Sequence, residues 1–280
     1  MTESIPGRQD IFFHVGLSKA ASTYLQKRVF PELKGIQYIH RNRYWKFQQI
    51  IEQSPGGRFL VSREAAERLE HRVLEFAGYE PTGKVILVLR RHDDWIASHY
   101  RRYVKNGGSF PLEKFLDQST LLGNDWRKGG PCFKRMIEMI EIHFGSQPLV
   151  LFHEDLQQDR TGFMKQLAAF TDTSYDDEKI DHRPIHLSWS EKQLKLSRSV
   201  GRYVFRPAPS ENPNQRFNRL RRRLRLWSCY FILGIAGLVP ARYTNNEPLI
   251  PKELLEQIHR LYSKDWQTCR AYAEANNPET

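Results

Sequence analysis

The sequence predicts an α/β fold of three layers, in which helices flank a central parallel sheet and a helical C-terminal region follows. Short apolar runs alternate with stretches of helical spacing from residue 11 to about residue 172, as in a parallel sheet. Most runs are continuous, which is typical of strands buried on both faces. Two of them lead into unusual polar clusters, at 16–23 and 90–98. Because such sheets bind ligands at the carboxyl ends of their strands, we expect these clusters to share one site.

Each element follows from a local pattern. Aliphatic and aromatic residues predict strands at 11–15, 58–62, 84–91 and 148–156. Helical spacing predicts helices at about 23–29, 63–78, 93–106, 133–144 and 160–172. Asp93 or Asp94 can cap the third of these helices, and Gly145 ends the fourth.

The alternation of strands and helices is lost after about residue 175. The stretch 205–215 is rich in proline and polar residues and predicts a loop. We therefore expect a nucleotide-binding core formed by 1–204, and a loop and helical extension, 205–280, that packs on the same domain.

The charge balance points to an anionic partner. The 280 residues include 43 Lys and Arg against 32 Asp and Glu, a net charge of +11. A nucleotide, a nucleic acid, an acidic polymer or a membrane surface would each fit this charge, and a merely basic surface is the simpler alternative.

The cysteines and the chain start bear on the compartment. The three cysteines are far apart and form neither a metal-binding spacing nor a disulfide framework, so a reducing compartment is expected. The first ten residues are polar and predict no secretory segment. We expect a cytoplasmic protein, with peripheral contact with the inner face of the membrane as an open alternative.

The first cluster has the layout of a phosphate-binding loop. Gly16 follows the first strand, and Lys19, Ala20, Ala21, Ser22 and Thr23 precede a helix. Backbone amides and hydroxyls at such a turn can hold a phosphate, to which a lysine adds a point charge. The Walker A pattern places its lysine directly before the Ser or Thr, which is not the order here. A P-loop-like fold is expected, but an NTPase or kinase is disfavoured.

The second cluster ends the buried strand with Arg90 and continues into a helix that carries Ser98. An arginine fork and a hydroxyl could clasp one further phosphate. Alone this signal is weak, since an arginine after a strand often only covers the edge of a core.

Together the two clusters resemble the sulfotransferases that use 3′-phosphoadenosine 5′-phosphosulfate (PAPS). The matching residues are Lys19 with Ser22-Thr23, and Arg90 with Ser98-His99-Tyr100. Their form is most similar to bacterial carbohydrate-type members, and the likeness covers roughly residues 10–200. Ala21 stands where the family usually has glycine, Ser18 replaces a proline, and the proline after Arg90 is missing.

The resemblance implies roles for these residues. Lys19 would neutralise the charge on the bridging oxygen as the nucleotide leaves. Residues 20–23 would hold the 5′-phosphosulfate, and Arg90 and Ser98 the 3′-phosphate. Arg202, in the short motif Gly-Arg-Tyr, is a weaker candidate for binding the nucleotide. No metal is required.

Glu64 is the candidate base for the acceptor hydroxyl. It resembles the glutamate of the Ser-x-Glu segment in carbohydrate-type members, and the alternative is a solvated glutamate at a helix start. His14 lies inside a predicted strand, where a core histidine is more usual, and His92 and His99 are outside candidates. The triplet Arg-Lys-Gly at 127–129 resembles a nucleotide-binding triplet of cytosolic sulfotransferases, but that triplet comes near the C-terminus, so we attribute this likeness to chance.

The segment 216–239 places an arginine-rich stretch before an apolar, aromatic one. The segment 226–239 is shorter than the roughly 20 residues needed to span a bilayer. A buried core helix with a solvated basic end is the preferred interpretation, and a helix lying on an anionic membrane is the alternative.

The sequence therefore favours an enzyme that transfers a sulfuryl group from PAPS to a hydroxyl of a carbohydrate, glycolipid or lipid acceptor. A small-molecule kinase is the alternative enzyme. A basic nucleic-acid-binding protein is the alternative outside enzymes, but no nucleic-acid module is recognised.

Overall fold

The computed structural model describes residues 9–64, 69–118, 131–183, 189–204, 215–240 and 247–279. The chain divides into two compact units. The first unit comprises Met1–Arg91, Pro131–Ile185 and Tyr262–Thr280, and the second comprises His92–Gly130 and His186–Leu261. The expected division cuts the chain once, after residue 204, whereas each of these units combines separate segments. The expected division stays a prediction.

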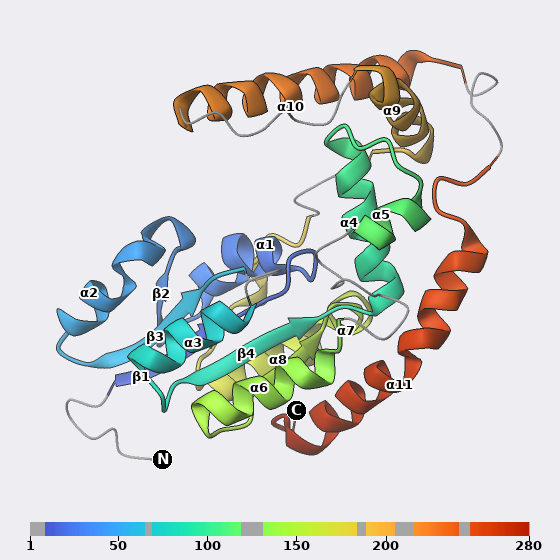
Figure 1. Cartoon of the computed structure of the whole chain (residues 1–280). Helices are drawn as coiled ribbons and strands as arrows, with labels where there is room; N and C mark the ends of the chain where they lie inside the picture. The colour runs from blue at the N-terminus through green and yellow to red at the C-terminus, as the bar shows by residue number, and fades with distance from the viewer. Residues whose placement is uncertain are drawn as a thin grey trace. The chain divides into compact units, whose positions relative to one another are not determined.

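The first unit is built on a five-stranded sheet (Figure 1) in which every pair of neighbouring strands is parallel. The order is β2-β3-β1-β4-β5, with β1 in the centre. The bounds are β1 Gln9–His14, β2 Gln37–Ile39, β3 Gly57–Ser62, β4 Lys84–Leu89 and β5 Leu149–Phe152. This sheet confirms the expected α/β fold.

Two details of the sheet differ from the prediction. Strand β2 was not predicted, because an edge strand of three residues is too short to show a pattern. The fourth predicted strand ends at Phe152 instead of residue 156, since helix α7 (His153–Gln158) begins directly after it.

Helices cover both faces of the sheet, and β1 shows why. Successive side chains of a strand point to opposite faces. Phe13 packs against Phe76 and Phe144, on one face, with ring centroids 4.3 and 5.9 Å away. Phe12 packs against Phe170 on the other face, at 6.0 Å. The sheet is thus the middle of three layers.

The helices after β1 and β3, and helices α6 and α8, follow predicted ranges, whereas η3, α2 and η6 were not predicted. The helical segment after β1 runs from Ser22 to Glu32, as α1 (Ser22–Tyr24), a π-helical turn η1 (Leu25–Val29) and a 3₁₀ turn η2 (Phe30–Glu32). The others are η3 Arg41–Lys46, α2 Phe47–Glu52, α3 Leu69–Tyr79, α6 Phe133–Phe144, α8 Arg160–Thr171 and η6 Asp177–Lys179. Helices α3 and α6 pack side by side (Figure 1).

The described part of the second unit is helical. It holds α4 (His92–Lys105), α5 (Leu112–Gln118), α9 (Glu191–Val204), α10 (Gln215–Leu238) and the beginning of α11 (Lys252–Asn276). Helix α9 packs against both α4 and α10. Lys192 fastens the end of α10, because its Nζ donates to the carbonyls of Gly237 and Val239 at 2.9 and 2.8 Å.

Helix α10 corrects the preferred interpretation of 216–239 as a buried core helix. Only one side of it is buried, by Cys229, Leu233 and Ala236. Trp227 and Leu238 are 68% and 86% exposed, so most of its apolar surface faces solvent. Among the described residues, no helix is both long and apolar enough to cross a membrane.

Candidate active site

The loop after β1 begins at Gly16, whose backbone lies close to the side chains of His14 and Ser22. The amide of Val15 still donates to Ile86 of β4, at 3.0 Å, and the chain then turns at Gly16. A Cβ atom on Gly16 would lie 2.4 Å from His14 Nε2 and 2.5 Å from Ser22 Oγ. Only glycine fits there, which explains the glycine at the start of the loop.

The backbone of the loop is left-handed at two positions without glycine. Lys19 has a φ of 71° and Ala21 a φ of 60°. A residue with a Cβ atom pays roughly 1–2 kcal/mol in this region, whereas glycine enters it freely. The alanine at position 21 therefore has a conformational cost, in addition to any effect on the approach of a ligand.

The two hydroxyls of the loop have different surroundings. Ser22 is buried, and its Oγ donates to the carbonyl of Leu17 at 2.9 Å, which ties the helix start to the loop. Thr23 is half-buried, and its Oγ1 donates to Glu64 Oε1 at 3.4 Å. The phosphate contacts expected of residues 20–23 stay predictions.

Glu64 reaches the loop from the neighbouring strand. Strand β3 pairs with β1 so that Ser62 lies beside His14, and the amide of Arg63 donates to the His14 carbonyl at 3.0 Å. This pairing places Glu64, two residues after Ser62, beside Thr23. Any helix that begins in residues 65–68 lies outside the described residues, so the helix-start alternative for Glu64 is still open.

Arg90 reaches the same loop from the other side. It follows β4, which pairs with β1 on the edge opposite to β3. Its Nη1 donates to the Lys19 carbonyl at 3.2 Å. Three adjacent strands thus place Glu64, the loop and Arg90 at one carboxyl edge, where the order of the strands reverses about β1 and α/β sheets bind ligands.

Two predicted binding residues belong to the second unit. Ser98 is half-buried on α4, and Arg202 is exposed on α9. Their association with Arg90 and the loop stays a prediction. The triplet at 127–129 lies outside the described residues.

The end of β5 adds residues that the sequence analysis did not select. Glu154 Oε1 accepts a hydrogen bond from the amide of Arg91 at 3.0 Å. Burial and the nearby Arg90 guanidinium lower the pKa of His153 to about 4, so this imidazole is neutral at pH 7. The available signal was the polar sequence His153-Glu154 directly after a buried strand.

His14 is a core residue, as expected from its place in the strand. Its Nδ1 lies 2.8 Å from Ser62 Oγ, which also accepts from Gln26 Nε2 at 2.9 Å. Ser62 thus links Gln26 to His14, and the direction of its bond to His14 depends on the imidazole tautomer. Burial lowers the pKa of His14 to about 3. The other histidines considered, His92 and His99, are buried on α4.

No family model matches this chain, and no curated protein matches it. Two sulfotransferases are among the solved structures that are similar to it. A sulfotransferase from Alicyclobacillus acidocaldarius is 13% identical, with a TM-score of 0.48, and the match covers 73% of this chain and 98% of that chain. Mouse sulfotransferase SULT7A1, complexed with PAP, is 16% identical, with a TM-score of 0.45, and the match covers 95% and 88%. At these values neither likeness carries an argument about activity.

Proposed function

We propose that this protein transfers a sulfuryl group from PAPS to a hydroxyl group of an acceptor. The observation that carries the proposal is the convergence of Lys19, Glu64 and Arg90 at the carboxyl ends of β1, β3 and β4. A cationic loop, a carboxylate and a guanidinium are the groups that a transfer from a doubly phosphorylated, anionic donor requires. Their order along the chain matches the resemblance to PAPS-dependent sulfotransferases.

The proposed reaction assigns one role to each group. Glu64 accepts the proton of the acceptor hydroxyl as its oxygen bonds to sulfur. The bond from sulfur to the bridging oxygen breaks, and the electron pair leaves with the nucleotide phosphate. The Lys19 ammonium group neutralises this developing charge. By analogy with phosphoryl transfer the transition state is loose, so positioning and charge supply most of the rate.

Recognition of the donor is assigned to the loop and to the end of β4. Residues 20–23 would bind the 5′-phosphosulfate at the helix start, where unpaired amides and the helix dipole favour an anion. Arg90, with Ser98 from the second unit, would bind the 3′-phosphate, and Arg202 is a weaker candidate for binding the nucleotide. The reaction as proposed needs no metal.

One observation favours the alternative of a small-molecule kinase. Thr23 Oγ1 lies 3.4 Å from the Glu64 carboxylate, and a loop hydroxyl beside a carboxylate is the pair that holds Mg²⁺ in P-loop enzymes. The position of Lys19, three residues before Ser22, opposes this function. The two functions require different nucleotides, and this difference separates them.

The acceptor is proposed to be a carbohydrate, a glycolipid or a lipid alcohol, as in the bacterial carbohydrate-type members that the sequence resembles. We place the protein in the cytoplasm, peripheral to the inner face of the membrane, because all three cysteines are free thiols and α10 exposes apolar side chains. No nucleic acid is involved in the proposed function.

The deciding experiment compares the thermal shifts caused by two nucleotides. Adenosine 3′,5′-bisphosphate at about 100 times its Kd should raise Tm by roughly 5 °C. ATP with Mg²⁺ should raise Tm much less, and EDTA should not change the shift with the bisphosphate. A larger, EDTA-sensitive shift with ATP would favour the kinase. Incubation with radiolabelled PAPS and a panel of glycans, glycolipids and lipid alcohols then identifies the acceptor.

A further inference from the structure

Helix α10 carries its apolar side chains on a side that nothing in the described chain covers. Cys229, Leu233 and Ala236 form its buried side. The exposed apolar residues recur every three or four positions, so they line one stripe along the opposite side of the helix. This stripe consists of Leu220, Leu224, Trp227, Phe231, Ile235 and Leu238.

The stripe is large and contains aromatic side chains. Trp227 is 68% exposed and stacks on Phe231, with ring centroids 5.7 Å apart. Soluble proteins seldom expose a continuous apolar surface of this extent unless it binds a partner or a membrane. The stripe therefore needs an occupant.

Arginines flank the stripe on both sides. With 100° of rotation per residue, Arg216, Arg219 and Arg223 lie along one flank, and Arg221 lies along the other. The sequence of α10 contains no acidic residue. A second α10 packed against this one would offer these arginines no carboxylates, whereas an anionic bilayer offers phosphates beside an apolar interior.

We propose that α10 docks this protein onto an anionic membrane, with the stripe inserted at the boundary between headgroups and acyl chains. The arginines on both flanks then lie at the level of the lipid phosphates. Cys229, Leu233 and Ala236 form the side of α10 that stays buried within the second unit. The inference extends the proposed lipid-linked class of acceptor. Membrane docking is tested without a sulfuryl donor, so a failure of this proposal can be distinguished from a failure of the proposed sulfuryl transfer.

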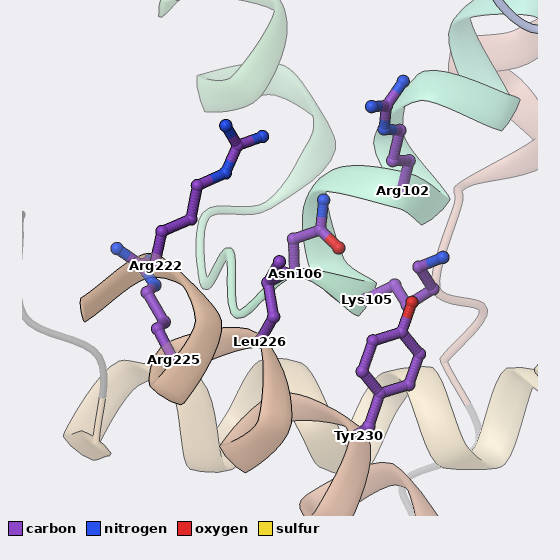
Figure 2. A pocket seen from close by; sticks show the side chains of 7 residues that line it. All are labelled: Arg102, Lys105, Asn106, Arg222, Arg225, Leu226 and Tyr230. Carbon is purple, nitrogen blue, oxygen red and sulfur yellow. The ribbon is translucent and has the colours of Figure 1, made fainter. Parts of the chain in front are cut away.

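The second unit has a further cationic surface, which provides a matched control. A pocket of about 380 Å³ between α4 and α10 is lined by Arg102, Lys105 and Asn106 from α4 and by Arg222, Arg225, Leu226 and Tyr230 from α10 (Figure 2). Arg222 is exposed, but it is seven residues before Cys229, so it points to the same side of the helix as Cys229 and away from the stripe. Charges in this pocket should contribute less to membrane binding than those that flank the stripe.

The test is co-sedimentation of the full chain with vesicles of phosphatidylcholine alone, or with added phosphatidylglycerol. We expect binding to the anionic vesicles only, weakened by salt. The double variant Trp227→Ser/Phe231→Ser should bind at least about tenfold more weakly. Its far-UV spectrum and Tm should be unchanged, since both side chains are exposed. Equal binding by this variant would overturn the proposal.

Two further comparisons locate the contact. Acyl-brominated lipid should quench part of the tryptophan emission, and Trp227→Phe should remove that part while it preserves binding. Arg219→Gln/Arg223→Gln should weaken binding more than Arg102→Gln/Lys105→Gln, although both pairs remove the same charge. Equal weakening would mean that net charge alone drives the binding, and would overturn the docking by α10. A dimer that dissociates in the Trp227→Ser/Phe231→Ser variant and does not bind vesicles would assign the stripe to a second copy.

Discussion

Arg90 Nη1 donates a hydrogen bond to the carbonyl oxygen of Lys19, at 3.2 Å, although the two residues are 71 positions apart. This bond joins the loop after β1 to the end of β4. It fixes the backbone from which the Lys19 side chain projects. A residue assigned to the 3′-phosphate thus also positions the residue assigned to the leaving oxygen.

Replacement of Arg90 should reduce discrimination between nucleotides. The native protein should bind adenosine 3′,5′-bisphosphate about 10–100-fold more tightly than adenosine 5′-phosphate, because a charge-assisted bond is lost with the 3′-phosphate. In Arg90→Gln this ratio should fall towards one, as measured by calorimetry. An unchanged ratio would remove Arg90 from the 3′-phosphate site.

Replacement of Lys19 should affect the chemistry much more than the fold. Lys19→Met should lower the rate of sulfuryl transfer about 10²–10³-fold, the usual loss when one group that stabilises a developing charge is removed. Tm should change little, because the Lys19 side chain is only half-buried. Lys27→Met, at an exposed position of the adjoining helix, is the control and should retain full activity.

Replacement of Glu64 should lower turnover without weakening nucleotide binding. Glu64→Gln keeps the shape and an acceptor for Thr23, but it removes the base, so kcat should fall about 10²-fold or more. Glu70→Gln, an exposed position in α3, should behave as the native protein. An equal kcat for Glu64→Gln would place the base elsewhere. Tighter binding of ATP with Mg²⁺ by native protein than by Glu64→Gln would favour the kinase.

Glycine at position 21 should stabilise the protein. Because Ala21 has a φ of 60°, Ala21→Gly should remove strain and raise the free energy of unfolding by about 1 kcal/mol, less the entropy of the freer unfolded chain. Ala77→Gly, inside α3, is the opposing control and should cost about 1 kcal/mol. Destabilisation by Ala21→Gly would show that the left-handed conformation carries no strain.

Protonation of His14 should make stability depend on pH. Burial lowers the pKa of His14 from 6.5 to about 3, so below pH 6.5 the unfolded chain binds a proton that the folded chain excludes. The stabilisation is therefore complete above pH 6.5 and is lost as the pH falls towards 3. Between pH 7 and pH 5 the share due to His14 is about 2 kcal/mol.

The measurement is denaturant unfolding at pH 7 and pH 5 for the native protein and for His14→Asn. The variant should show a smaller loss of stability between the two values, because its residue 14 does not titrate. All other groups contribute to both proteins alike. If both lose the same amount, His14 takes up its proton in the folded state as easily as in the unfolded one.

The candidate site was only partly predictable from the sequence. The pattern placed Lys19 and Arg90 after buried strands, and parallel strands bring their carboxyl ends to one edge, so their proximity followed. It did not reveal the buried chain from Gln26 through Ser62 to His14, because polar partners far apart in sequence leave no periodic trace. Nor did it select His153, whose lowered pKa depends on burial and on Arg90 from another strand.

The parallel α/β sheet was predictable from the residue pattern alone, since continuous apolar runs must be buried on both faces and the helices between them supply the cover. The helical end of the chain was predictable in the same way. The contacts between distant residues became known from the folded structure. It made Ala21 left-handed, set Thr23 against Glu64, and left the apolar side of α10 uncovered. The reason is that periodicity shows which side of an element is apolar, whereas its contacts depend on how distant segments pack together.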